Sequence, residues 1–254
     1  MIHQAIASTI LLLLVAGIAS AQSGTAFRAE GYLGYTNLEL GPIDEDAFQG
    51  GAGGSFSAFW DALYFQFDVF GDHLEYQDFD TDTVGGAIHA GWRDPERGAL
   101  GVAATYDHLE LFDQGSDLGR AGLEGELFLD RFSFGATAGF AQLEGDSTGY
   151  ADAALTFYPT DRARLRLRAG AYDVEESDPF VMFGANGELL LFDSLALFAR
   201  WEATLVDDRL DYEQHSIVGG VRLYFGAEEP SLIAYDRRHF KESCLGVAIF
   251  ARAC

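Results

Sequence analysis

The chain has 254 residues, with 40 acidic side chains against 16 Lys and Arg, and a net charge of −24. This charge excludes a nucleic-acid-binding protein, because phosphates are bound by clustered Lys and Arg. The 21 Phe, 11 Tyr and 3 Trp, with 48% hydrophobic residues overall, exclude a disordered chain. Two cysteines make no disulfide scaffold and form no CxxC or Cys/His zinc motif, so we expect no cofactor.

The N-terminal segment is typical of a secretory signal peptide. An unbroken apolar run from Ile10 to Val15 is followed by the small residues Ala19, Ser20 and Ala21, which form a cleavage pattern. We predict that residues 1–21 are removed and that the mature chain leaves the cytoplasm. The alternative is an N-terminal membrane anchor, for which the apolar run is short.

Apolar and polar residues then alternate strictly along most of the chain. Between 63 and 72 every second residue is apolar, and between 162 and 172 alanines and leucines alternate with four arginines. A period of two over about ten residues indicates strands with one apolar and one polar face. The pattern predicts twelve strands, at 26–40, 50–60, 63–72, 83–93, 99–108, 118–129, 132–141, 149–158, 162–172, 180–190, 195–205 and 215–225.

The connections between these strands alternate in length. Turns such as 61–62 and 130–131 are short, whereas the segments 41–49, 73–82, 109–117, 142–148, 173–179 and 206–214 are longer and polar. Short turns at one end, long loops at the other and an even strand count are the pattern of a bacterial outer-membrane barrel. Only a closed barrel satisfies the backbone of membrane strands. We therefore predict an all-β fold in which residues 22–225 form a closed antiparallel transmembrane β-barrel.

The alternative fold is a soluble β-sandwich or a lipocalin-like barrel, whose core is filled by large apolar side chains. Here the non-apolar face is rich in Gly, Ser, Thr, Arg and Glu, for example Gly51, Gly53, Ser55 and Ser57. Such a face suits a lumen better than a hydrophobic core. The membrane barrel is therefore favoured.

The predicted strands resemble those of small Gram-negative outer-membrane β-barrels of the porin-like type. The nonapeptide IVGGVRLYF, from Ile217 to Phe225, is similar to the closing strand that the assembly machinery of such barrels reads. The resemblance implies a bacterial outer membrane, with lipid and lipopolysaccharide as surroundings and both termini in the periplasm. Because Phe225 is not terminal, residues 226–254 would form a periplasmic C-terminal tail.

The tail carries a cluster of basic residues and both cysteines. Its basic residues could touch the cell wall or lipid phosphates, and an oxidising periplasm would let Cys244 and Cys254 form a disulfide. The alternative is a frayed tail with free thiols. The basic residues are Arg237, Arg238, His239 and Lys241.

Charges are segregated in the predicted barrel. The longer loops hold 20 of the 40 acids against one base, Arg209, which suits a solvated surface or one that attracts cations, without a metal-site motif. The parity of the strands points nine Arg and nine acids inward. From these we select as pore-lining candidates Arg162, Arg164, Arg166, Arg168, Arg120, Arg200, Arg222, Glu124, Glu126 and Asp68.

These inward charges allow two functions. Opposed charged walls suit a channel for passive diffusion of small polar solutes, anions included, with the four arginines of 162–168 at the constriction. This ladder also resembles the Arg tracks of twelve-stranded acidic-oligosaccharide channels. The alternative is a non-conducting structural or adhesion barrel, whose lumen is closed by ion pairs and whose acidic loops bind cations or partners.

A catalytic function is not predicted. Some outer-membrane barrels are lipid hydrolases with Ser and His on the outer wall, and His73, His108 and His215 fall near the loop rim, with Ser116 or Ser216 close in sequence. A nucleophile and its base must share a face. His215 and Ser216 point in opposite directions, and no Ser/His motif is present.

Overall fold

The computed structural model describes residues 24–241, apart from 42, 78, 112–113, 144–145, 174–178, 207–211 and 227–229. The predicted signal peptide and both Cys244 and Cys254 lie outside the described residues, so the cleavage and the disulfide stay predictions. None of the helices in the described part is long and apolar enough to cross a membrane.

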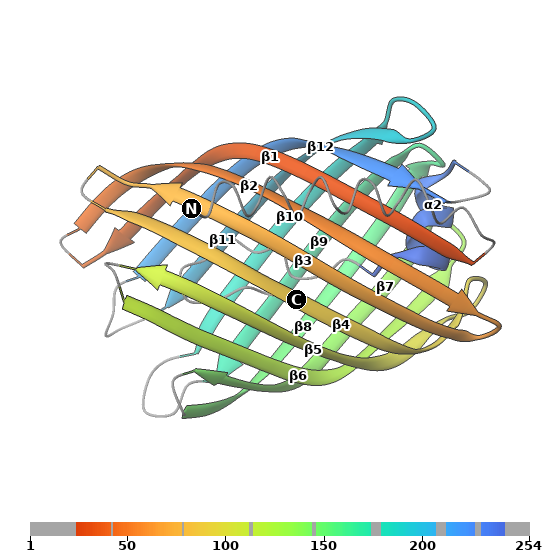
Figure 1. Ribbon diagram of the computed structural model, residues 1–254, viewed down its shortest axis with the longest axis horizontal. Coiled ribbons are helices and arrows are strands. Elements are labelled where there is room, and N and C mark those ends of the chain that lie inside the picture. The colour runs from red at the N-terminus through yellow and green to blue at the C-terminus, as the bar shows by residue number, and fades with distance from the viewer. Residues whose placement is uncertain are drawn as a thin grey trace.

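Twelve antiparallel strands close into a barrel in chain order (Figure 1). The first strand completes the ring by pairing with the last, from Phe27 with Phe225 to Leu40 with Tyr212. This closure confirms the predicted fold class and strand number. The strands are β1 (Thr25–Leu40), β2 (Ile43–Trp60), β3 (Leu63–Glu75), β4 (Asp80–Asp94), β5 (Gly98–Leu111), β6 (Gln114–Leu129), β7 (Phe132–Leu143), β8 (Asp146–Thr160), β9 (Ala163–Asp173), β10 (Phe180–Leu190), β11 (Leu195–Val206) and β12 (Tyr212–Phe225).

The two ends of the barrel differ. We call the end with the short connections, such as Asp61 and Ala62, the turn end, and the opposite end the loop end. At the loop end the strands run further than predicted: β2 begins at Ile43 rather than at 50 and pairs with β1 up to Leu40. The expected loop at 41–49 is therefore mostly strand. Acidic residues occupy both faces of this part of β2. The apolar/polar alternation therefore ends while the backbone pairing with β1 continues.

Large apolar side chains cover the outside of the barrel. On β3, Leu63 and Phe65 are 64% and 44% exposed, whereas Tyr64 and Gln66, which alternate with them, are buried. On β9, Leu165 is exposed and Arg164 is buried. Apolar residues outside and polar residues inside are the arrangement that a lipid environment favours.

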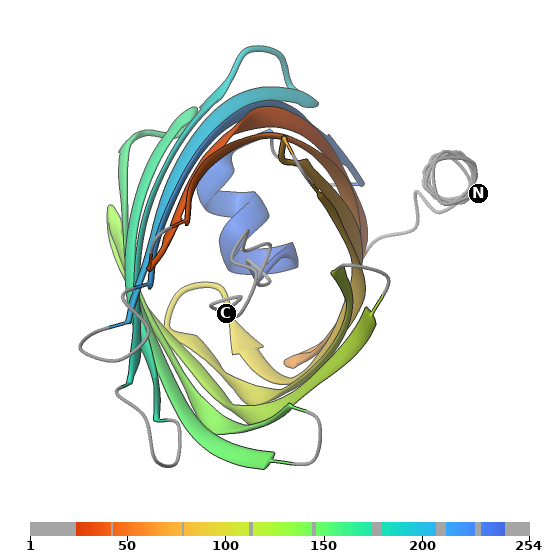
Figure 2. The ribbon, with the colours of Figure 1, turned by 90° about the vertical axis from the view of Figure 1, so that its left-hand side faces the viewer.

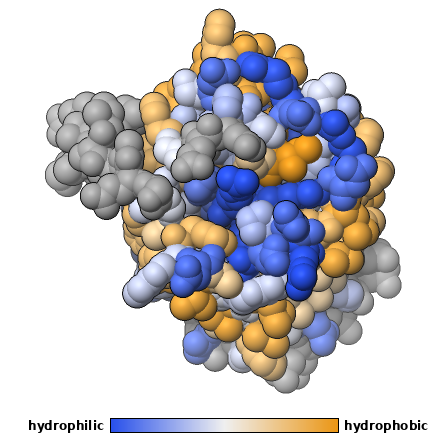
Figure 3. Space-filling view, turned by 90° about the vertical axis from the view of Figure 1, so that its right-hand side faces the viewer, coloured by the Kyte–Doolittle hydropathy of each residue, from blue (hydrophilic) through white to orange (hydrophobic). Residues whose placement is uncertain are grey.

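After β12 the chain turns back into the barrel. Figure 2 shows the short helix α2 (Leu232–Ala234) and the π-helical turn η1 (Tyr235–His239) inside the ring of strands. Figure 3 looks onto the turn end, where hydrophilic residues gather over the middle of the face and hydrophobic residues lie mainly around it. The described part of the expected tail thus occupies the lumen instead of extending from it. So short a helical segment has no periodicity that the sequence could reveal.

Candidate functional site

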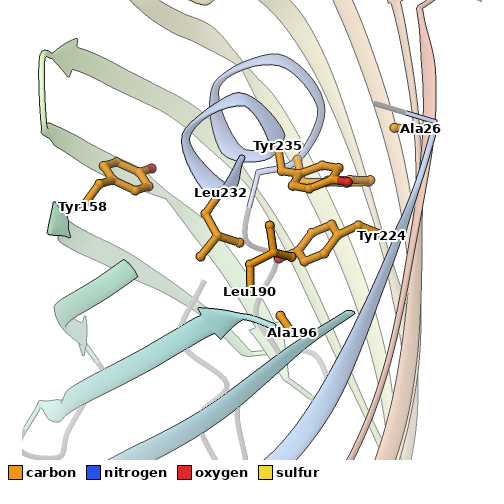
Figure 4. Close-up of a cluster of buried hydrophobic side chains, with 8 residues drawn as sticks. Ala26, Tyr158, Leu190, Ala196, Tyr224, Leu232 and Tyr235 are labelled. Atoms are coloured by element: carbon orange, nitrogen blue, oxygen red, sulfur yellow. The ribbon is translucent and has the colours of Figure 1, made fainter. Parts of the chain in front are cut away.

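The segment 231–241, which we call the plug, packs inside the lumen at the turn end through apolar contacts. Leu232 and Tyr235 are buried against wall residues that include Tyr158 and Tyr224 (Figure 4). Phe240 belongs to the same cluster. The rings of Tyr235 and Tyr224 stack with centroids 4.2 Å apart. All the large apolar side chains of the plug except the partly buried Ile233 are therefore removed from water.

The Asp236 carboxylate of the plug binds hydrogen-bond donors on the barrel wall. The Asp236 side chain accepts hydrogen bonds from Arg164 Nη1 at 2.6 Å and from Tyr158 Oη at 2.9 Å. Its backbone carbonyl accepts a bond of 2.7 Å from Arg93 Nη1. Asp236 thus occupies a site that would equally suit the carboxylate of a small molecule.

Hydrogen bonds and an ion pair also hold the C-terminal end of the plug. The Gln66 amide donates to the carbonyl of Lys241 and accepts from its backbone N–H, both at 2.7 Å. The ammonium of Lys241 lies 2.9 Å from Glu124 Oε2. The ring of Phe240 lies 5.2 Å from the Arg28 guanidinium, close enough for a cation–π contact.

One plug residue is buried without its usual hydrogen bonds. Burial, together with the positive charges of Arg238 and Arg93, lowers the pKa of His239 to about 4. Its Nδ1 is enclosed and has no hydrogen-bond partner among the described residues. The docked plug therefore requires a neutral His239 imidazole. Burial and the nearby Asp193 also raise the pKa of the Tyr235 hydroxyl, to about 12.

Most of the predicted pore-lining residues lie in tight contacts, in the turn half of the barrel except for Arg120, which lies towards the loop end. Arg164 and Arg222 both approach Glu188 Oε2 at 2.5 Å, and Arg222 also approaches Glu30 at 2.6 Å. The remaining close pairs are Arg93 with Glu126 at 2.7 Å, His89 with Glu124 at 2.8 Å and with Asp68 at 3.2 Å, and Arg120 with Asp107 at 2.7 Å.

Arg162 differs from the expectation. It lies in the turn between β8 and β9, its side chain is 45% exposed, and its Nε donates to the carbonyl of Leu190 at 3.0 Å. It does not line a constriction. Residue parity fails here because the strand begins one residue later, at Ala163.

The other ladder arginines lie in the middle of the lumen. Arg166 on β9, Asn186 on β10 and Arg200 on β11 are direct neighbours in register. The next row towards the loop end holds Arg168, Gly184 and Glu202. Their ion pairs are loose, with 3.5 Å between Arg168 and Asp152 and 3.6 Å between Arg200 and Glu202.

The sequence analysis did not select several residues of this site. His89, Tyr64 and Tyr158 have inward parity, so the alternation could have identified them as lumen residues. The contacts of Asp236 and Gln66 could not be predicted from the apolar/polar alternation, because they form only when the plug enters the barrel.

The loop end also contains buried apolar residues. Leu38, Leu74, Tyr76, Val206 and Tyr212 form a cluster inside that end. Apolar side chains therefore cluster at both ends of the barrel.

The rim histidines contact carboxylates. His73 lies 2.8 Å from Asp82, and His108 lies 2.7 Å from Asp117. The imidazole of His215 stacks on the outward Trp201, whereas the Ser216 hydroxyl bonds to Thr36 inside the barrel. Within the described residues, no group of three His, Cys, Asp or Glu is placed to hold a metal.

Solved structures share this architecture at low sequence identity. The translocator domain of the autotransporter NalP from Neisseria meningitidis aligns over 87% of this chain and 95% of its own, with a TM-score of 0.56 and 13% identity. The KdgM porin in complex with disordered oligogalacturonate aligns over 76% of this chain and 98% of its own, with a TM-score of 0.53 and 8% identity. Outer membrane phospholipase A from Escherichia coli aligns over 76% and 92%, with a TM-score of 0.50 and 13% identity.

The chain thus has the outer-membrane β-barrel fold. No protein-family model and no curated protein matches the sequence. Because a translocator, a porin and a phospholipase share the fold, the fold does not choose among their functions. That choice depends on the lumen.

Proposed function

We propose that this protein is an outer-membrane channel for small polar solutes, anions included, and that the plug closes it at rest. The supporting observation is that wall charges at the turn end take their partners from the plug. Arg164 binds Asp236, and Glu124 binds Lys241. When the plug leaves, it exposes a charged wall that water and polar solutes can enter, whereas a permanently closed barrel needs no such wall.

We infer the surroundings from the apolar outer face and from the family resemblance of the sequence. The apolar outside contacts lipid and, in the outer leaflet, lipopolysaccharide. The turn end faces the periplasm, and the assembly machinery reads the strand that ends at Phe225. Solutes would then enter at the loop end and reach the plug last.

A non-conducting structural or adhesion barrel is the second candidate. The buried pairs of Arg222 with Glu30 and Glu188, together with the apolar cluster at the loop end, support it. A catalytic function has less support, because His215 and Ser216 lie on opposite faces of the wall.

Conductance of the full chain in planar bilayers separates the two candidates. We would compare the wild type with the double variant Asp236→Asn/Phe240→Ala, which loses a polar and an apolar anchor of the plug. Asp61→Asn is the matched control, since Asp61 lies exposed in a turn at the same end. The channel function predicts rare openings in the wild type and in the control, and frequent openings in the double variant. A folded, inserted double variant without conductance would favour the structural barrel.

A further inference from the structure

Two arginines in the middle of the lumen carry buried donors that the described wall does not use. Nε and Nη2 of Arg168, and the same two atoms of Arg200, are enclosed and make no hydrogen bond among the described residues. Their closest carboxylate oxygens lie 3.5 and 3.6 Å away, beyond a good charge-assisted bond. Arg200 as a whole is only 8% exposed.

Two other arginines of the same wall use all three nitrogens of their guanidinium groups. Arg222 approaches two carboxylates at 2.5 and 2.6 Å. Arg120 donates to Asp107, Thr105 and Tyr172 at 2.7 to 2.9 Å. The middle of the lumen is thus distinguished by two arginines that each leave two donors unused, whereas Arg28 and Arg93 at the turn end each leave one. Buried donors without partners are costly, so such a group indicates a ligand.

Contacts other than the loose ion pairs also orient the two side chains. An ideal Cβ at Gly184 would lie only 3.0 Å from Arg168 Cγ, so the glycine leaves the room in which the Arg168 side chain lies. The Arg200 guanidinium lies 5.1 Å from the Tyr32 ring centroid, in cation–π contact. Both guanidinium groups are preorganised, which lowers the entropic cost of binding a ligand.

The strand between them supplies a neutral group and no charge. Asn186 on β10 pairs in register with Arg200 on one side and with Arg166 on the other, and its Oδ1 is enclosed without a partner. Arg166, Arg168 and Arg200 share this region with the acids Asp152 and Glu202, and the charges of Glu30 and Asp72 also reach Arg200. An acceptor between two sets of donors suits a solute with carboxylates and a hydroxyl group.

We propose that Arg168, Arg200 and Asn186 form a binding site for a small hydroxylated carboxylate. The arginines bind the carboxylates and Asn186 accepts a hydrogen bond from a hydroxyl. This inference deepens the proposed function, on which it rests, because it names the class of solute that the channel would carry.

The test is calorimetric titration of tartrate, succinate and inorganic phosphate into the full-length protein in detergent, without any measurement of conductance. The plug double variant is titrated in parallel, so that entry from the turn end is also available. We expect tartrate to bind, succinate to bind more weakly because it lacks hydroxyl groups, and phosphate to bind more weakly still. Raised salt should weaken all three.

Arg168→Gln and Arg200→Gln should each raise the tartrate dissociation constant about tenfold, the size expected for a lost charge-assisted bond. The matched control is Arg131→Gln, since Arg131 pairs with Asp161 at the exposed turn end. Gly184→Ala keeps every charge but displaces Arg168, so it should weaken binding even if an arginine variant fails to fold.

The outcomes separate this inference from the function on which it rests. Absence of binding in both the wild type and the plug variant, or equal weakening in Arg131→Gln, would overturn the carboxylate site. The channel would still stand if the plug variant conducts. Binding that Arg168→Gln and Gly184→Ala both weaken would support the site even if no variant conducts, and in that case the channel proposal alone would fail.

Discussion

Asp236→Asn tests whether the plug is a reversible closure. With the plug docked in the lumen, the Asp236 carboxylate accepts one hydrogen bond from Arg164 and one from Tyr158. Asparagine has nearly the same shape but no charge, and its amide N–H can donate to the Tyr158 hydroxyl while its Oδ1 accepts from Arg164. Arg164 keeps its contact with Glu188, so the wall of the barrel is not disturbed.

The expected effect follows from these two bonds. Hydrogen bonds to charged groups contribute about 1.5–3 kcal/mol each, against about 0.5–1.5 for neutral ones. The variant can keep both bonds, but it loses the negative charge that strengthens them. Docking should therefore weaken by about 1–3 kcal/mol, which raises the ratio of released to docked plug roughly 5- to 150-fold.

Single-channel recording of full-length protein measures this ratio as the open probability. Asp61→Asn makes the same change of charge at an exposed turn, where asparagine tolerates the positive φ of 53°. Its open probability should equal that of the wild type. An Asp236→Asn protein that is folded and inserted but opens no more often than the control would refute the argument that these two bonds hold the plug.

Three further predictions concern the plug and the wall. Phe240→Ala removes a ring that is 2% exposed and should weaken docking by about 3–5 kcal/mol, seen as more frequent opening with an unchanged melting temperature of the barrel. The docked pKa of His239, about 4, lies below its ordinary value of 6.5, so docking is strongest above pH 6.5 and weakens as the pH falls towards 4. The open probability should then rise by up to about tenfold per pH unit, and His239→Leu should remove this dependence; a wild type that opens equally at pH 7 and pH 5.5 would contradict it. Arg222→Met leaves Glu30 and Glu188 without their shared partner and should destabilise the barrel by about 3–5 kcal/mol, measured as a lower temperature at which the folded band disappears on unheated gels; an unchanged temperature would refute this.

The outward face could be predicted because lipid imposes one rule along every strand. Phe65 and Leu165 had to be apolar wherever the strand crosses the membrane, and the alternation therefore identified all twelve strands. At the loop end this rule lapses. Asp44 and Asp46 follow no apolar pattern, yet they lie on β2, which pairs with β1 through backbone bonds that carry no signal in the side chains.

The partners of the inward charges could not be predicted in the same way. Parity places Arg164 in the lumen, but its choice of Glu188 and Asp236 depends on the register between strands and on the entry of the plug. The plug itself has only Leu232, Tyr235 and Phe240 as large buried apolar anchors, too few for a periodic pattern. Its basic residues suggested a surface tail, whereas Lys241 is buried against Glu124.

The tether of the plug explains why conductance of the wild type alone is a weak test. Residue 231 lies only a few residues beyond the end of β12, so the plug stays at a high effective concentration near its site. Closing so short a connection costs little entropy, and the contacts of Leu232, Asp236 and Lys241 then add to an already favourable encounter. A channel closed in this way and a permanently closed barrel would both be silent at rest. The two kinds of barrel differ only when one anchor of the plug is removed. In a channel, the charged wall behind Asp236 then admits ions, whereas in a permanently closed barrel the charges of that wall pair with one another.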